Sequence, residues 1–278
     1  MRYKMLVICL FGNFFFCACI NTSSSVVMSN GEQYCFSSRQ DFHSFMQQHV
    51  HPQKKLVLYV NGKGPEPIRS QISVIPYIEK NYDVQVCMFC WPSFSWVIGY
   101  PLESAKQSGE DLAVCLREIN AYLIKHNRKC TLFAHSMGNI VVQSFIEKYD
   151  GSLRGDLFDN IILNAADTHF ANHTQWLKKI NFGKRIYVTY SNCDRVLRLS
   201  QIFKNRGKLR LGQRGFAKNS PAIYVDFTKN TGIYHEYFRG PSPRRKLAIR
   251  DFFYDAFHGE KVSMHHFKAK GKNHYSLF

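Results

Sequence analysis

The sequence predicts an α/β protein with a mostly parallel, doubly wound sheet and helices on both of its faces. Short apolar runs rich in β-branched residues recur along the chain, and segments with apolar residues at helical spacing lie between some of them. The chain has 278 residues, of which 45% are hydrophobic, a composition typical of one large domain with a sizeable core. Strands that alternate with helices favour a parallel sheet with its ligand site at the carboxyl ends of the strands.

The predicted elements follow one another from residue 54. Two segments have the apolar spacing of helices: residues 109–126, with Leu112, Leu116 and Ile119, and the segment after residue 136. Six apolar runs predict strands, at residues 54–62, 83–93, 131–134, 158–167, 184–194 and 221–227. We see no internal repeat and no low-complexity block.

The N-terminus predicts export. Arg2 and Lys4 precede an apolar run of about a dozen residues, which is the pattern of a secretory signal and is short for a membrane span. Cys19 after Ala18 also resembles the lipobox of bacterial lipoproteins, although Phe16 stands where Leu is usual. Residues 1–19 are therefore expected to be a signal peptide or lipoprotein signal, the alternative being an uncleaved anchor. We expect an exported protein of the bacterial cell envelope, periplasmic or lipid-anchored, or a secreted one.

The cysteines predict neither a metal site nor a redox pair. Cys87 and Cys90 form a CxxC motif, but they lie in a predicted strand at positions that face opposite sides of the sheet. The other cysteines after the signal region are scattered and specify no disulfide. Buried free thiols are the expectation for most of them.

The charge predicts an anionic partner. The chain has 37 Lys and Arg against 20 Asp and Glu. Such a surplus favours phospholipid headgroups or phosphate-bearing substrates, the alternative being a solvated basic face. Nucleic acid is not expected, because no recognisable binding module accompanies the charge. Residues 198–218 hold seven cations and no acid: Arg198, Lys204, Arg206, Lys208, Arg210, Arg214 and Lys218.

The stretch CTLFAHSMGNIVVQSF, residues 130–145, predicts a nucleophile elbow. Ser136 lies where the pattern changes from a buried strand to a helix, as in the turn that holds a hydroxyl above the edge of a sheet. The usual pattern has Gly two residues before and two residues after the serine. Gly138 fits the second position, whereas Ala134 occupies the first and adds a methyl group where strand and helix approach.

Two further residues complete a predicted catalytic triad. Asp194 follows the second strand after the serine, and His235 lies in the loop beyond the last strand, so the order is that of an α/β-hydrolase triad. A serine hydroxyl needs an imidazole to take its proton, and a carboxylate holds that imidazole in the right tautomer. Asp167 also ends a strand and is the alternative acid.

Donors for the oxyanion are predicted on two loops. One is the backbone N–H of Met137, the residue after the nucleophile. The other comes from the loop YVNGKG, in which Lys63 is the donor expected by position and Gly62 lets the loop approach the substrate. His135, next to the nucleophile, is expected to support the elbow at the substrate site rather than to abstract the proton.

The chain resembles a bacterial α/β-hydrolase family with uncharacterised substrates and an HSMGN-type nucleophile elbow. The resemblance covers about residues 56–240. The resemblance is carried by WPS (91–93), Tyr100, AHSMGN (134–139), Asp167 with Phe170, YSNCD (190–194) followed by Leu197 and Ser200, RLG (210–212) and YHEYF (234–238).

The resemblance implies the α/β-hydrolase fold and gives Ser136, Asp194 and His235 the triad roles. Two positions depart from the family pattern: Asn61 stands where His is more common before the oxyanion glycine, and HEYF replaces the commoner HSYF. Neither departure removes a catalytic group. The implied division is an N-terminal extension at 20–54, the hydrolase domain at 55–240, and a basic C-terminal segment at 241–278 that packs on the domain or trails it.

The expected function is that of an exported serine hydrolase, esterase-like or lipase-like, that cleaves an ester through an acyl-enzyme. No metal or organic cofactor is needed for this chemistry. Two alternatives remain open from the sequence. One is a catalytically silent α/β-hydrolase fold that acts as an envelope binding protein, and the other is an acyltransferase with the same triad.

Overall fold

The structure is a computed structural model that describes residues 24–36, 41–64, 73–93, 99–149, 151, 153, 156–239 and 247–277. The signal expected at residues 1–19 lies outside these ranges. Within them, no helix combines the length and the apolar character needed to cross a membrane.

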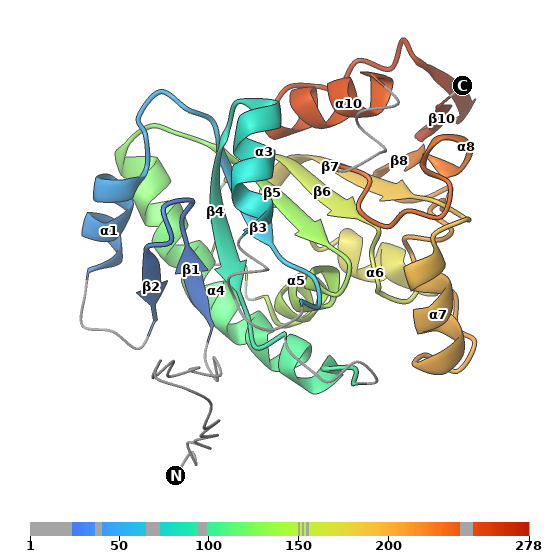
Figure 1. Cartoon of the computed structure of the whole chain (residues 1–278), viewed down its shortest axis with the longest axis horizontal. Coiled ribbons are helices and arrows are strands. Elements are labelled where there is room, and N and C mark those ends of the chain that lie inside the picture. The colour runs from blue at the N-terminus through green and yellow to red at the C-terminus, as the bar shows by residue number, and fades with distance from the viewer. Residues whose placement is uncertain are drawn as a thin grey trace, which may run out of the picture.

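One ten-stranded sheet organises the molecule, in the order β2-β1-β4-β3-β5-β6-β7-β8-β10-β9 (Figure 1). The strands from β4 to β10 in this order pair in parallel, whereas β1, β2 and β9 pair antiparallel at the two edges. The strand bounds are β1 Ser25–Val27, β2 Gln33–Cys35, β3 Leu56–Val60, β4 Gln85–Cys90, β5 Cys130–His135, β6 Phe158–Asn164, β7 Gly183–Tyr190, β8 Ile223–Asp226, β9 Phe267–Gly271 and β10 His274–Leu277.

Helices cover both faces of the sheet, and each face has its own buried core. Residues of α1, α4, α5 and α6 pack in one core, and residues of α3 and α10 pack in the other. Strand β5 contributes side chains to both cores, because Leu132 and Ala134 face the first core while Phe133 faces the second. The helix bounds are α1 Phe42–His49, α3 Val74–Tyr82, α4 Leu102–Lys125, α5 Gly138–Lys148, α6 His173–Leu177, α7 Arg195–Phe203, α8 Thr228–Thr231 and α10 Leu247–Phe257.

The expected architecture, a mostly parallel sheet with helices on both faces, is confirmed. All six predicted strands are present, and the helix predicted at 109–126 belongs to α4, which begins earlier, at Leu102. Cys87 and Cys90 lie in the two different cores, so the CxxC motif does not bring its thiols to one side of the sheet. Burial raises the pKa of each of these thiols to about 12.

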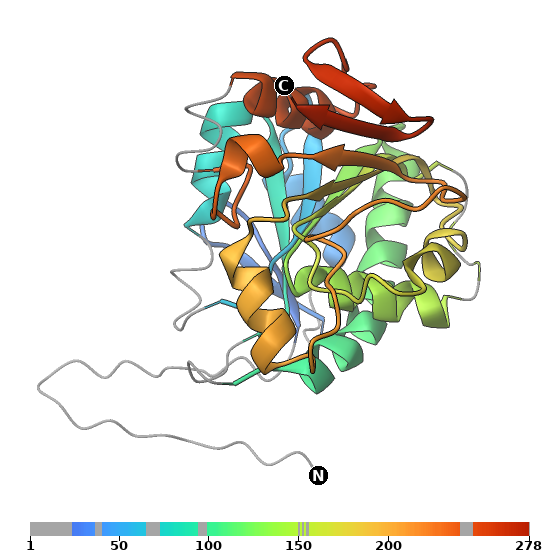
Figure 2. The same cartoon turned by 90° about the vertical axis from the view of Figure 1, so that its right-hand side faces the viewer.

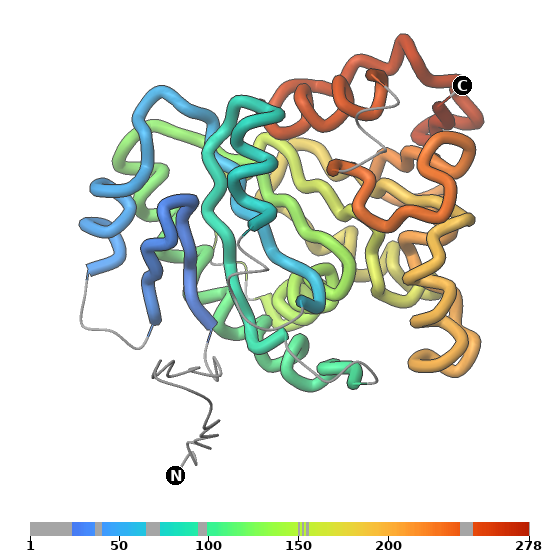
Figure 3. The backbone as a smooth tube through the Cα atoms, viewed as in Figure 1, coloured from blue at the N-terminus to red at the C-terminus, as the bar shows by residue number. Residues whose placement is uncertain are grey.

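The sheet also includes chain on both sides of the expected 55–240 domain. Strands β1 and β2, from the segment expected as an extension, join the sheet beside β4. Strands β9 and β10, from the C-terminal segment, join it at the opposite edge beside β8. Figure 3 shows the first described segments, in blue, and the last ones, in red, on opposite sides of the parallel strands.

The register of the parallel strands positions the functional loops. Val60 of β3 pairs with Ala134 of β5, and His135 of β5 pairs with Asn164 of β6. Tyr190 at the end of β7 pairs with Asp226 at the end of β8. The loops that follow these strands therefore begin at one edge of the sheet, the edge at which parallel sheets bind ligands.

Candidate active site

Ser136 occupies a strained turn between β5 and α5. Its φ angle is 54°, a left-handed conformation that is uncommon for a residue other than glycine. Gly138 is required two residues later, because a Cβ there would lie 2.4 Å from the carbonyl oxygen of Val60. Ala134 is fully buried in β5. The backbone at Ser136 thus has the geometry predicted for an elbow.

Asn139 holds the elbow from inside. Its fully buried side-chain amide Nδ2 donates to the carbonyl oxygens of Ala134, Ser136 and Asn164, at 3.2, 3.0 and 3.2 Å. One amide group therefore ties the strand before the nucleophile, the nucleophile itself and the neighbouring strand together. Sequence reasoning placed Asn139 in the motif without giving it this role.

His235 and Asp194 form a hydrogen-bonded pair. Nδ1 of His235 lies 2.7 Å from Oδ2 of Asp194, whose side chain is fully buried, and the His235 side chain is 12% exposed. Burial disfavours the charged imidazole, but the Asp194 carboxylate outweighs it and raises the pKa of His235 above its ordinary value. The second oxygen of Asp194 accepts the N–H of Leu197 at 3.0 Å and caps α7.

Tyr237 is a partner of this pair that sequence reasoning did not assign. Its hydroxyl donates to Oδ2 of Asp194 at 2.8 Å, so this one oxygen contacts both Tyr237 and His235. Burial, and then the Asp194 charge, raise the pKa of Tyr237 well above its ordinary value, so that it remains a donor. The only sequence signal for it was its place in the YHEYF segment.

The other ring nitrogen of His235 is buried and has no hydrogen-bond partner among the described residues. The His235 ring lies 4.7 Å from the ring of His135, which directly precedes Ser136. The Nδ1 of His135 lies 2.9 Å from Nδ2 of Asn164, which fixes the His135 ring. Burial, followed by the nearby His235 and Arg239, lowers the pKa of His135 well below its ordinary value, so His135 is neutral.

Asp167, the alternative acid, has different partners. Its buried carboxylate accepts from Nε of Arg210 at 2.7 Å, from the Ser200 hydroxyl at 2.8 Å and from the Tyr100 hydroxyl at 3.0 Å. Its backbone N–H donates to the carbonyl oxygen of Ser136 at 3.1 Å. Burial raises the pKa of Asp167, and Arg210 opposes the rise. Asp194, not Asp167, is therefore the carboxylate hydrogen bonded to His235.

This cluster corrects one expectation. Arg210 was counted in the basic stretch at 198–218, yet its side chain is only 1% exposed and is paired with Asp167. It therefore belongs to the interior and not to a basic surface. The cluster also unites four residues that the family resemblance included without roles: Tyr100, Asp167, Ser200 and Arg210.

The loop after β3 packs directly against the elbow. A Cβ on Gly62 would lie 2.9 Å from Cβ of Ser136, so only glycine lets this loop approach so closely. Asn61 fixes the loop, since its Nδ2 donates to the Gly62 carbonyl at 3.0 Å and its own carbonyl accepts from the Trp91 indole at 2.8 Å. The Nζ of Lys63 donates to the Gly99 carbonyl at 2.6 Å.

Met137 lies at the start of α5, where helix N–H groups have no intrahelical acceptor. Its own N–H donates to no other described residue. The orientation of such N–H groups, together with the helix dipole, suits a negative charge placed above the turn.

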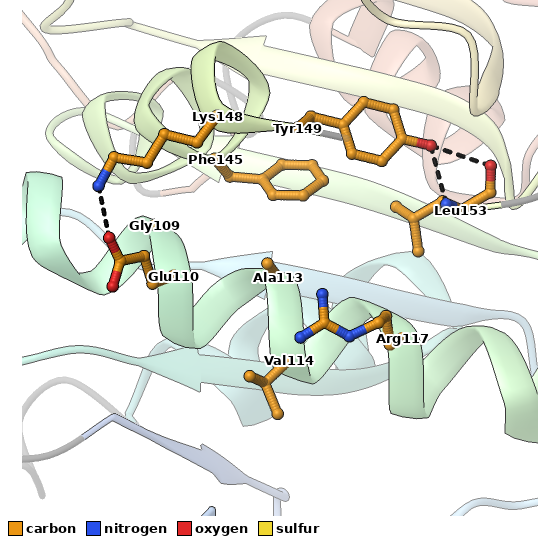
Figure 4. Close-up of a pocket in the computed structure, with 9 residues that line it drawn as sticks. All are labelled: Gly109, Glu110, Ala113, Val114, Arg117, Phe145, Lys148, Tyr149 and Leu153. Atoms are coloured by element: carbon orange, nitrogen blue, oxygen red, sulfur yellow. Dashed lines mark hydrogen bonds and ion pairs between the residues drawn. The ribbon is translucent and has the colours of Figure 1, made fainter. Parts of the chain in front are cut away.

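The pocket in Figure 4 is separate from this site. It has a volume of about 280 Å³ and lies between α4 and the last turn of α5, lined among others by Ala113, Phe145 and Tyr149. Ser136 precedes the first turn of the same helix, and 11 helical residues span about 16 Å. The Glu110–Lys148 ion pair at 2.6 Å closes one end of this pocket, which contains no triad residue.

Comparison with known proteins identifies one matching family model, described as an alpha/beta hydrolase of unknown function (DUF900), over residues 36–230. A Pyrobaculum calidifontis esterase structure has a TM-score of 0.42 at 11% identity and covers 76% of this chain and 78% of its own. The structure of a cold-adapted esterase from an Arctic intertidal metagenomic library has a TM-score of 0.42 at 13% identity, and the match covers 75% of this chain and 85% of the esterase chain. The structure of an esterase of the planctomycete Thermogutta terrifontis has a TM-score of 0.41 at 10% identity, and the match covers 74% of this chain and 83% of the esterase chain. No curated protein matches the chain.

Proposed function

The chain belongs to the α/β-hydrolase family of unknown function (DUF900) and has the α/β-hydrolase fold, and from this premise we propose that it is a serine hydrolase cleaving an ester through an acyl-enzyme on Ser136. The observation that carries the proposal is the buried Asp194–His235 pair, whose second imidazole nitrogen is left without a partner next to the strained elbow. A base held in this way has one nitrogen free to take a proton.

Acylation begins when Nε2 of His235 takes the proton of the Ser136 hydroxyl. The serine oxygen then bonds to the ester carbonyl carbon, and the carbonyl oxygen becomes the oxyanion of a tetrahedral intermediate. The bond from this carbon to the leaving oxygen breaks, and the imidazolium returns its proton to that oxygen. An alcohol leaves, and the acyl group remains on Ser136.

Deacylation repeats these steps with water. His235 removes a proton from water as the water oxygen bonds to the acyl carbon, and the Ser136 oxygen leaves and regains the proton. The product is a carboxylic acid. Asp194 accepts the Nδ1–H of His235 throughout, which keeps Nε2 basic and stabilises the imidazolium.

The oxyanion is proposed to accept hydrogen bonds from the N–H of Met137 and from the loop at Gly62 and Lys63. The Met137 N–H is the better supported donor, because it lies at the helix start and has no acceptor among the residues described. Removing one such donor costs about 2.7–4 kcal/mol of transition-state stabilisation. The His135 ring, held neutral by burial, adds no charge beside the base.

The test is hydrolysis of p-nitrophenyl esters of graded acyl length by the purified chain and by Ser136→Ala. We expect the wild type to release p-nitrophenol with a preference for one range of chain lengths, and Ser136→Ala to show only the buffer rate. Ser144→Ala, on α5 but away from the elbow, is the matched control and should retain the wild-type rate.

The two alternatives predict different results from the same material. A silent binding fold gives no turnover of any ester by well-folded wild type. An acyltransferase gives a wild-type rate that rises when an alcohol acceptor is added, with the acyl group recovered on that alcohol. Either result would replace ester hydrolysis as the function.

We further propose that the chain is exported to the bacterial cell envelope. The support is the charge and apolar pattern of residues 1–19, with lipidation at Cys19 as the specific form. Mass spectrometry of protein from the native host should find a mature chain that begins near Cys19, with a diacylglyceryl adduct if it is a lipoprotein. An intact Met1 on protein recovered from the cytoplasm would contradict export.

A further inference from the structure

The outer side of α7 and the loop after it form a surface that the proposed reaction does not use. In Figure 1, α7 lies at the right of the molecule, and in Figure 2 it faces the viewer, so it stands at the outside of the fold. Its inner side is held by Leu197 and Ser200. We call the exposed part the α7 face: Arg195, Val196, Arg198, Leu199, Ile202, Phe203, Lys204, Arg206, Lys208 and Leu209.

Large apolar side chains are exposed on the α7 face. Phe203 is 72% exposed and Ile202 is 56% exposed, with Val196 and Leu199 about half exposed beside them. Most of the large hydrophobic residues that the described chain exposes lie on this face or at Ile233 and Tyr234. Exposed apolar residues that gather in one place indicate a docking surface.

The charges on the α7 face are all positive. No acidic residue occurs in the sequence between Asp194 and Asp226. Among the described residues, no salt bridge involves Arg195, Arg198 or Arg206. The surface therefore combines protruding apolar groups with Arg195, Arg198 and Arg206, which form no salt bridge with a described acid.

A groove beside α7 has the same mixed chemistry. It has a volume of about 590 Å³ and lies between α7 and residues 209–214. Arg198 and Arg214 supply two cations, and Ile202 and Leu209 supply apolar walls. The amides of Asn192, Gln201 and Gln213 complete the lining. Two arginines and two apolar side chains in one groove suit the phosphate of a lipid headgroup with its acyl chains alongside.

We propose that the α7 face docks on an anionic phospholipid surface, with a headgroup phosphate in the groove between Arg198 and Arg214. A short helix with Leu, Ile and Phe exposed beside Lys and Arg is the pattern of a segment that lies in a membrane interface. A soluble anion or a nucleic acid would match the cations alone. The protruding Ile202 and Phe203 side chains select a partner that also has an apolar interior.

The docking surface meets the candidate active site at two points. Asp194 is the N-cap of α7, so the helix starts at the triad acid. The N–H of Arg195 donates to the carbonyl of Ile233 at 3.3 Å, and the exposed Ile233 and Tyr234 directly precede His235. A lipid surface against α7 therefore borders the triad, although docking itself does not require the proposed hydrolysis.

Vesicle binding tests the proposal independently of catalysis. The full chain with Ser136→Ala is mixed with phosphatidylcholine vesicles, with and without phosphatidylglycerol, and the bound fraction is measured by flotation. We expect much tighter binding to the anionic vesicles. Any contribution of residues 1–23 is common to all variants, so the readout is the difference between the two vesicle types.

Two variants and two matched controls separate the components of the surface. Arg198→Gln/Arg206→Gln/Lys208→Gln should weaken binding to anionic vesicles by about 100-fold, at about fivefold for each cation near an anionic leaflet. Ile202→Ser/Phe203→Ser should also weaken it, by at least tenfold. The charge control is Lys55→Gln/Lys80→Gln/Lys268→Gln, and the apolar control is Ile124→Ser/Leu247→Ser, in which both side chains are 64% exposed. Both controls should bind as the parent does.

Equal binding of the parent to both vesicle types would overturn the proposal. So would a charge control that weakens binding as much as the α7 variant, because the effect would then belong to net charge. Binding to single-stranded DNA as tight as that to vesicles, unchanged by Ile202→Ser/Phe203→Ser, would assign the face to a polyanion instead. Failure of ester hydrolysis by the wild type leaves all of these outcomes unaffected.

Discussion

Asp194→Asn is the substitution that best separates the chemistry of the triad from its packing. The carboxylate accepts from Leu197 N–H with one oxygen, and its other oxygen contacts His235 and Tyr237. In the variant, the amide oxygen can keep the helix cap, and the amide nitrogen replaces the second oxygen. That nitrogen donates to Nδ1 of His235, so the imidazole proton moves to Nε2. A protonated Nε2 cannot accept the proton of Ser136.

The expected loss follows from this wrong tautomer. In serine triads generally, such a change lowers kcat about 10⁴-fold. Asp194→Ala should lose similar activity and, in addition, about 2–4 kcal/mol of unfolding free energy, of which about 1 is the helix cap and about 1–3 the lost hydrogen bond from the Tyr237 hydroxyl to the carboxylate. The assay is p-nitrophenyl ester turnover together with urea unfolding. An Asp194→Asn protein that is folded and turns over within tenfold of wild type would show that this carboxylate does not set the tautomer of His235.

Three further predictions concern neighbouring groups. The kcat/KM is expected to fall as the pH drops through the pKa of His235, because only the neutral imidazole accepts a proton, and a midpoint below 6.5 in a pH–rate profile would contradict the raised pKa. Gly138→Ala should lose about 1–3 kcal/mol in urea unfolding, and Gly271→Ala, whose methyl would have its nearest neighbour 3.9 Å away, should not. Asp167→Asn should lose about 3–5 kcal/mol by leaving the Arg210 charge unpaired, whereas Asp167→Asn/Arg210→Met should recover part of the loss, as calorimetry can show.

The parallel core of the fold was predictable because its central strands β3, β4, β5 and β6 are almost entirely buried. In β3 and β5, all residues are buried, which the apolar pattern of the sequence requires. The edge strands β2 and β9 have no such pattern. Strand β9 is the segment FKAKG, exposed after its first residue, and its pairing depends on β10, which only the folded chain brings beside β8.

The elbow was predictable for a local reason, since Ser136 and Gly138 are set by the turn between one strand and one helix. The choice between Asp194 and Asp167 was not settled by order along the chain, because both follow strands that end at the same edge. It depends on which carboxylate His235 contacts across 41 residues of sequence. Arg210 was misplaced on a basic surface because a run of cations carries no signal that one of them pairs with a buried acid.

The proposed function depends above all on whether Ser136 is a reactive nucleophile. The purified chain is treated with a fluorophosphonate probe, and the labelled residue is identified by mass spectrometry of its peptides, with Ser136→Ala and His235→Ala in parallel. We predict one adduct, on Ser136, that is absent in Ser136→Ala and strongly reduced in His235→Ala. Equal labelling of wild type and Ser136→Ala, or no labelling of folded wild type, would contradict this prediction.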